Sequence, residues 1–202
     1  MIKDKLTPQN GWTTNSMKIK VPENSLFFTL STIAAKQFGR NKIPDIFKLL
    51  SVNKSIFLPW LHFASKLMPY GKLAAREREL IILRVAWLCK CRYEWGQHIE
   101  IGINKAKLSD EDIINITKGT TAFKLKKEQL LIKACDEFKT ENSISAQTWQ
   151  ILSTYYNDAL LLEISFLIGH YIMLAGILNS TGLPLEQNME DFLQAFHKRI
   201  SI

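Results

Sequence analysis

The sequence contains few of the residues that interrupt helices or cross-link a chain. Its 202 residues include three cysteines, six prolines and nine glycines. A small, odd number of cysteines argues against the disulfide framework of a small secreted domain, and the scarcity of proline and glycine leaves room for long helices. The N-terminus also lacks an apolar stretch followed by a cleavage site, so we expect a cytoplasmic protein.

No stretch rich in Pro, Gly or Ser divides the chain, and 47% of its residues are hydrophobic, which is enough for one sizeable core. We expect a single domain over residues 1–202, with a basic N-terminal arm at about 1–24 and a C-terminal helical tail at about 188–202. The net charge is +7, and residues 1–54 hold nine Lys or Arg against three Asp or Glu. Because no helix-turn-helix, zinc-finger or RNA-binding signature is present, we expect a solvated arm and no specific nucleic-acid partner.

Apolar residues recur at helical spacing along most of the chain, and no strand pattern of comparable length appears. Ser109 with Asp112 predicts a capping box at one helix start, and Asn157 is a typical cap for the next long helix after it. The sequence therefore predicts an all-α fold. The expected helices are 25–38, a short one after Pro44, 54–68, 74–106, 109–119, 124–139, 145–156, 157–179 and the C-terminal tail.

The segment 160–178 is long and apolar enough to span a bilayer. Glu163 and His170 lie inside it, and a charge at membrane depth is costly, so we expect no membrane partner. The apolar residues surround the predicted helix on every side, whereas a surface helix of a monomer needs only one apolar stripe. We therefore expect a homo-oligomer in which a second subunit covers this helix.

Four residues with reactive side chains share one face of the helix predicted over 74–106. These residues are Glu79, Cys91, Glu94 and His98. A thiol, two carboxylates and an imidazole on a mostly apolar face are costly to bury, and together they supply an acid, a base and a nucleophile. The alternative is structural: a buried cysteine, a hydrogen-bonded Glu–His pair, and a glutamate paired with neighbouring arginines.

The same run resembles the signature helix of the carboxymuconolactone decarboxylase and alkylhydroperoxidase D-like superfamily. The alkylhydroperoxidase D pattern is Glu, eleven residues, Cys, two residues, Cys, three residues, His. Glu79, Cys91 and His98 match its Glu, first Cys and His, and Glu94 stands at the second Cys. The resemblance implies an alkylhydroperoxidase D-like helical bundle in which Glu79 and His98 relay protons. The run around Tyr93 and Glu94 looks like the branch closer to the decarboxylase.

A second region, 169–182, resembles the C-terminal helix of these proteins, so the likeness spans about residues 25–187. Arg84, Tyr93 and His170 are weaker candidates for binding the substrate, with Arg84 suited to an anionic group. No metal and no cofactor are expected, because the Glu-x-x-His pairs of di-iron bundles and the His-Glu-x-x-His motif are missing.

Three functions remain open. The first is an acid–base enzyme acting on a small organic acid, lactone or carbonyl compound, with His98 moving a proton and Glu94 assisting. The second is a thiol-dependent alkyl hydroperoxidase or antioxidant protein that uses Cys91 without a Cys-x-x-Cys partner, since Glu94 cannot form a disulfide and Cys89 is two residues away on a predicted helix. The third is a non-enzymatic helical assembly protein.

Overall fold

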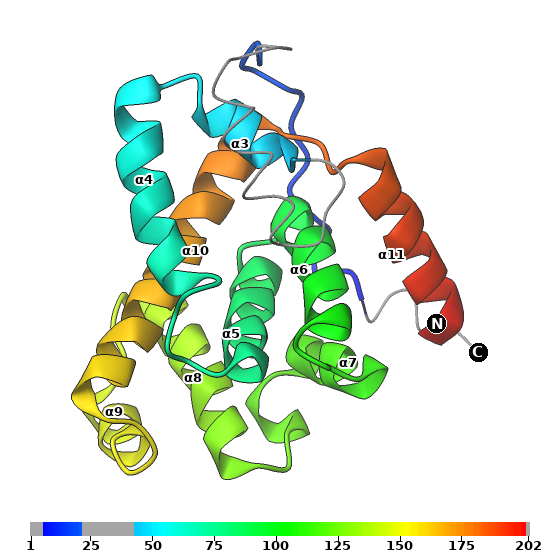
Figure 1. Cartoon of the computed structure of the whole chain (residues 1–202). Helices are drawn as coiled ribbons and strands as arrows, with labels where there is room; N and C mark the ends of the chain where they lie inside the picture. Colours follow the sequence, from blue (N-terminus) through cyan, green and yellow to red (C-terminus); the bar gives the residue numbers. More distant parts are fainter. Residues whose placement is uncertain (1–5, 22–42, 201–202) are drawn as a thin grey trace.

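The structure is a computed structural model that describes residues 6–21 and 43–200, and all its regular structure in these ranges is helical (Figure 1). This confirms the predicted all-α fold. The elements are α3 (Asp45–Leu50), α4 (Lys54–Leu67), α5 (Ala75–Leu88), α6 (Arg92–Asn104), α7 (Asp110–Lys118), the short 3-10 helix η1 (Thr120–Ala122), α8 (Lys126–Glu141), α9 (Ala146–Leu152), α10 (Asp158–Thr181) and α11 (Gln187–Ile200).

Helix α5 lies in the middle of the bundle and packs against α6, α7, α8 and α10 (Figure 1). Its residues from Arg78 to Ala86 are all buried. Ile81 and Val85 belong to one apolar cluster, which continues into α8 and α10. Leu80 and Leu83 belong to a second cluster, which continues into α6, α7 and α11. A helix that is covered on all sides holds any polar residue it carries inside the protein.

The single helix predicted over 74–106 is wrong, because the chain turns between α5 and α6. Lys90 adopts a left-handed conformation with φ of 51°, and Cys91 is the N-cap of α6 with extended backbone angles. α6 therefore folds back along α5 instead of continuing it. Cys89 and Cys91 are both free cysteines, but the helical spacing used to argue against a disulfide between them does not exist here.

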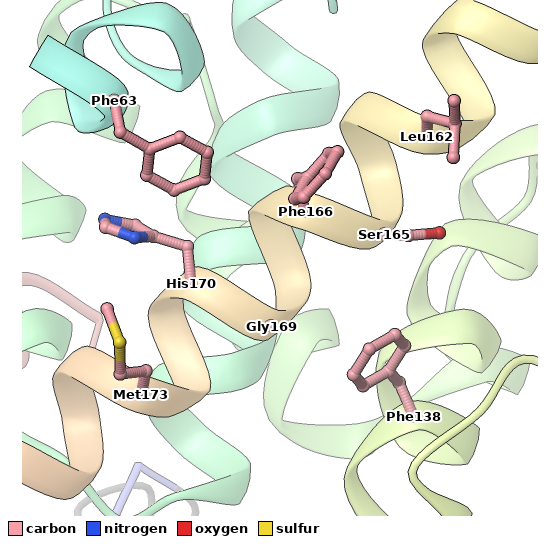
Figure 2. A pocket seen from close by; sticks show the side chains of 8 residues that line it. All are labelled: Phe63, Phe138, Leu162, Ser165, Phe166, Gly169, His170 and Met173. Atoms are coloured by element: carbon pink, nitrogen blue, oxygen red, sulfur yellow. The ribbon is translucent and has the colours of Figure 1, made fainter. Parts of the chain in front are cut away.

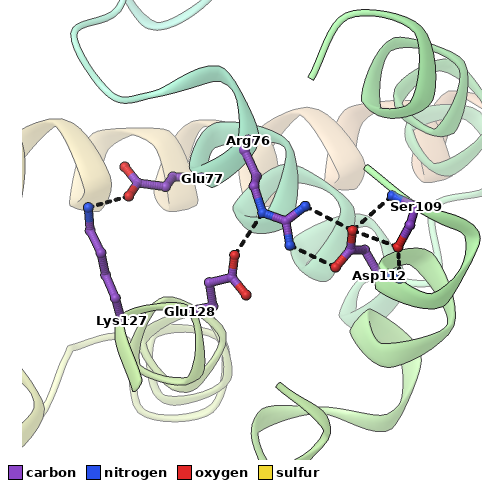
Figure 3. A network of polar contacts seen from close by, with 6 residues as sticks. All are labelled: Arg76, Glu77, Ser109, Asp112, Lys127 and Glu128. Carbon is purple, nitrogen blue, oxygen red and sulfur yellow. Dashed lines mark hydrogen bonds and ion pairs between the residues drawn. The ribbon is translucent and has the colours of Figure 1, made fainter. Parts of the chain in front are cut away.

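An ion-pair network joins α5 to the start of α7 and α8 (Figure 3). Arg76 binds Asp112 through two hydrogen bonds of 2.8 and 2.7 Å and Glu128 through one of 2.7 Å. Asp112 also accepts from the backbone N–H of Ser109, so the predicted capping box is confirmed. Glu77 pairs with Lys127 in the same region. These contacts fix the first turn of α5, directly before Arg78 and Glu79.

Helix α10 begins at the predicted cap and ends at Thr181, two residues beyond the predicted end at 179. The side chain of Asn157 accepts a hydrogen bond from the N–H of Leu160, and Gly182 ends the helix with φ of 71°. Within the described residues, α10 is the one helix long and apolar enough to cross a membrane. Core helices of globular proteins pass the same test, so this is weak evidence for a span.

The remaining helices near the middle of the chain lie close to their predicted bounds, with α9 shorter than 145–156. The helix predicted at 25–38 lies outside the described residues. Residues 6–21 of the predicted arm are irregular but are not simply solvated. Leu6 is 1% exposed, and the ring of Trp12 lies 5.6 Å from Trp87 and 5.7 Å from Trp95.

Candidate active site

Three buried ionisable side chains meet between α5 and α6. Nδ1 of His98 lies 2.7 Å from Oε2 of Glu79, and Nε2 of His98 lies 3.4 Å from Oε2 of Glu94. Glu79 is 0%, Glu94 3% and His98 5% exposed. Glu94 and His98 are one turn apart on α6, whereas Glu79 reaches them from α5 because the two helices pack side by side. The fold thus brings together three of the four predicted catalytic residues, through a hairpin and not a common helix face.

The two carboxylates set the protonation state of His98. Burial lowers the pKa of an imidazole, but Glu79 and Glu94 outweigh it and raise the pKa of His98 to about 9. The ring is therefore an imidazolium near neutral pH, and both its N–H groups donate toward carboxylates. Glu79 accepts the short hydrogen bond from Nδ1, whereas Glu94 lies farther from Nε2. The proton at Nε2 is therefore the one available for chemistry.

Cys91, the fourth predicted catalytic residue, is fully buried at the start of α6. Burial raises the pKa of its thiol far above the usual value, and the Glu94 carboxylate raises it further. The backbone N–H groups of Tyr93 and Glu94 lower it, but by less. A thiol with a raised pKa stays protonated, and the protonated form is a poor nucleophile.

Tyr171 on α10 lies against the imidazole, although it was not among the predicted site residues. Its ring packs edge-on to that of His98, with 5.2 Å between centroids. Burial raises the pKa of Tyr171 well above its usual value, and the Glu94 and Glu79 carboxylates raise it further. Its hydroxyl therefore remains an O–H donor, and it points to Sδ of Met68 at 3.4 Å. The sequence signal was its position next to His170 in the run that resembles the family.

Arg84 and Tyr93 have structural partners away from His98. Nε of Arg84 donates to Asp136 at 2.6 Å and its Nη1 to the carbonyl of Ile116 at 2.6 Å, toward α8 and α7. The Tyr93 hydroxyl donates to Glu186 at 2.7 Å and accepts from a backbone N–H of α3 at 3.0 Å. The expectation that these two residues bind substrate therefore has no geometric support here.

His170 lines a separate apolar groove on the outer face of α10. Figure 2 shows its ring beside Phe63 of α4, with Phe166 and Met173 on the same helix. Burial lowers the pKa of His170 to about 4, so the ring is neutral near pH 7. Phe166 is 56% and Met173 46% exposed. The buried polar site therefore lies on the side of α10 that carries Tyr171, and the apolar groove lies on the side that carries His170.

Metal binding has no support in this part of the molecule. Within residues 6–21 and 43–200, no group of three or more His, Cys, Asp or Glu side chains is arranged to hold a metal ion. The groove in Figure 2 offers one imidazole and otherwise almost only apolar side chains.

The sequence matches one family model. Residues 56–124 match the carboxymuconolactone decarboxylase family, and this range holds Glu79, Cys91, Glu94 and His98. No curated protein matches the chain in sequence.

Solved structures share the fold at low sequence identity. An uncharacterised peroxidase-related protein from Silicibacter has a TM-score of 0.70 and 17% identity, with 90% of this chain and 95% of that one covered. An alkylhydroperoxidase core structure, an uncharacterised peroxidase-related protein from Ralstonia eutropha, has a TM-score of 0.74 and 15% identity, covering 87% and 95%. A protein of unknown function from Agrobacterium tumefaciens has a TM-score of 0.62 and 15% identity, covering 68% and 95%. At these identities the likeness concerns the fold alone.

Proposed function

We propose that this chain, which matches the carboxymuconolactone decarboxylase family model over residues 56–124 and shares its fold with alkylhydroperoxidase-like structures, is an acid–base enzyme acting on a small organic acid, lactone or related carbonyl compound. The observation that carries the proposal is the buried imidazole of His98 held between Glu79 and Glu94. A group whose pKa is moved by burial and by specific partners is a typical feature of catalytic sites.

In this proposal His98 is the general acid and Glu79 its positioning residue. Loss of CO2 from a β-keto acid or a carboxylated lactone leaves the electron pair of the broken C–C bond on the substrate as an enolate. The Nε2 proton of His98 is then transferred to the enolate carbon, and the imidazole regains a proton from water while the Glu94 carboxylate stabilises the charged ring. Glu79, at 2.7 Å from Nδ1, keeps the ring oriented and stabilises its charged form.

The thiol-dependent alternative uses the same helix but a different atom. In favour of it are the position of Cys91 and the peroxidase-related descriptions of two proteins that share the fold. Against it are the raised pKa of the Cys91 thiol and a carboxylate at position 94, where the pattern needs the second thiol. A sulfenic acid at Cys91 would have to be resolved by another thiol, with release of water.

A panel of β-keto acids and carboxylated lactones tests the proposal, with CO2 release as the readout. We expect turnover by the wild type and a loss of roughly 10²- to 10⁴-fold in His98→Gln, the usual contribution of a positioned acid. His62→Gln is the matched control, because His62 lies exposed on α4. Equal turnover by the wild type and His98→Gln would remove the basis of the proposal.

Peroxide treatment distinguishes the thiol-dependent alternative from the acid–base proposal. We expect Cys91 to remain a thiol, as judged by mass spectrometry, at millimolar peroxide, because its protonated form is favoured. Preferential oxidation of Cys91, ahead of the partly exposed Cys89, would favour the peroxidase. If neither substrate class is turned over, the non-enzymatic assembly protein is the remaining candidate, and the near-complete burial of the site agrees with it.

The proposed enzyme is also a homo-oligomer. The outer face of α10 leaves Leu162, Phe166 and Met173 about half exposed in the single chain. Burying apolar area against a second subunit stabilises association by about 25 cal/mol for each Å². A contiguous apolar surface of this kind is typical of an interface, and it agrees with the expectation drawn from the all-round apolar pattern of this helix.

A further inference from the structure

Helix α5 carries three arginines that differ in what holds them. Arg76 forms a two-bond fork with Asp112, and Arg84 donates to Asp136 and to a backbone carbonyl. Arg78 has no such partner. Within residues 6–21 and 43–200, no hydrogen bond to its guanidinium is present, and its Nε is buried without one.

The guanidinium of Arg78 forms a long ion pair with the carboxylate of Glu79 but no hydrogen bond to it. Its Nε is 4.0 Å from Oε1 of Glu79, which is too far for a hydrogen bond. Oε1 of Glu79 is likewise buried without a hydrogen bond, while Oε2 of the same carboxylate holds His98. Guanidinium groups remain charged and carry five N–H donors, so burying one without acceptors is costly unless a further acceptor is present.

Arg78 is the least buried member of this cluster. Its side chain is 11% exposed, compared with 1% for Glu79, 4% for Glu94 and 6% for His98. Its charge acts on Tyr171 as well, since the guanidinium lowers the pKa of that hydroxyl against the effect of burial and the carboxylates. Free donors therefore sit at the more exposed end of the site, with the imidazole further inside.

We propose that Arg78 is the residue that binds the substrate, through a carboxylate of an anionic organic acid. This inference rests on the proposed function, and it replaces Arg84 in the role that the sequence suggested. A planar carboxylate accepts two parallel N–H bonds from a guanidinium, a geometry that a lysine cannot supply. Such a substrate satisfies the free donors of Arg78 and lies beside the Glu79–His98 pair. The competing explanation is a water molecule bridging Arg78 and Glu79, which would make the arginine purely structural.

Binding of simple carboxylates distinguishes an anion-binding Arg78 from a structural one, and it requires no turnover. The probes are benzoate and acetate, with benzamide as the uncharged counterpart of benzoate, and the readout is the 15N NMR signal of the His98 ring at neutral pH. We expect both carboxylates to shift this signal in the wild type and benzamide to bind more weakly. Arg78→Gln should weaken benzoate binding by about tenfold or more, the usual worth of a charge-assisted hydrogen bond.

Two further variants guard against misreading a folding defect. Arg78→Lys keeps the charge but loses the fork, so we expect intermediate affinity for benzoate. Arg199→Gln is the matched control, since Arg199 is 52% exposed and pairs with Asp110 at the surface. Benzoate affinity that is unchanged in Arg78→Gln, benzamide binding as tightly as benzoate, or a wild type that binds neither carboxylate overturns the proposal.

Kinetics separates this inference from the proposed function. On any substrate of the panel, we expect Arg78→Gln to raise KM with little change in kcat, whereas His98→Gln lowers kcat. Arg78-dependent benzoate binding together with undiminished turnover in His98→Gln would leave the anion site standing and remove the acid–base role. Loss of turnover in His98→Gln with unchanged benzoate binding in Arg78→Gln would do the reverse.

Discussion

The pH dependence of stability reports directly on the charged state of His98. The rise of its pKa from the usual 6.5 to about 9 corresponds to roughly 3 kcal/mol of stabilisation when the unfolded chain is also protonated. Because the folded pKa is the higher one, this contribution is complete below about pH 6 and is lost as the pH rises from 6.5 through about 9. Removing the imidazole should therefore flatten the stability profile in this window.

Urea unfolding followed by circular dichroism, at pH values between 6 and 10, measures the effect. We expect the wild type to lose up to about 3 kcal/mol more than His98→Gln across this range. Other groups titrate in the same window, but they are common to both proteins and cancel in the difference. Glu79→Gln should flatten the profile in part, and His62→Gln, at an exposed position, should not. Parallel profiles for the wild type and His98→Gln would refute the reasoning that the two carboxylates hold an imidazolium.

Three other outcomes follow from the packing. Gly182→Ala should destabilise the protein by more than about 1 kcal/mol in urea unfolding. The reason is that φ is 71° at this position and that an added Cβ would lie 2.4 Å from the carbonyl oxygen of Ser16. Unchanged stability would mean that the turn after α10 relaxes freely. Arg84→Gln should lower the free energy of unfolding by roughly 2 kcal/mol through loss of the Asp136 pair but leave benzoate affinity unchanged. A loss of benzoate affinity without a loss of stability would show that Arg84 binds the anion. Light scattering of the wild type should give a multiple of 23.2 kDa, with Phe166→Glu shifting it toward the monomer; a monomeric wild type at micromolar concentration would show that α10 needs no second subunit.

Most helices could be predicted from the sequence because their ends carry local signals. Ser109 with Asp112 and Asn157 are side-chain caps whose hydrogen bonds are made within one turn. The turn between α5 and α6 has no such signal. It is made by Lys90 in a left-handed conformation, a position where glycine or asparagine is usual, and the apolar period continues through it. The sequence therefore predicted Glu79 and His98 on one face of a single helix, whereas they meet across two packed helices.

The roles of the arginines and of α10 could not be predicted from local patterns. Whether Arg78 or Arg84 is free depends on Asp136, which follows Arg84 by 52 residues in the chain and meets it only in the fold. Helix α10 is apolar on every side, so its period does not say which residue faces the site. The structure turns Tyr171 toward His98 and His170 toward the outer groove.

The central claim is that the reacting group is the imidazole and not the thiol, and one paired measurement tests it most directly. CO2 release from the best substrate of the panel is compared in Cys91→Ser and His98→Gln, both checked for folding by circular dichroism. We expect Cys91→Ser to keep most of the wild-type kcat, because its thiol is buried and protonated, and His98→Gln to lose roughly 10²-fold or more. Loss of activity in Cys91→Ser with activity retained in His98→Gln would contradict the account.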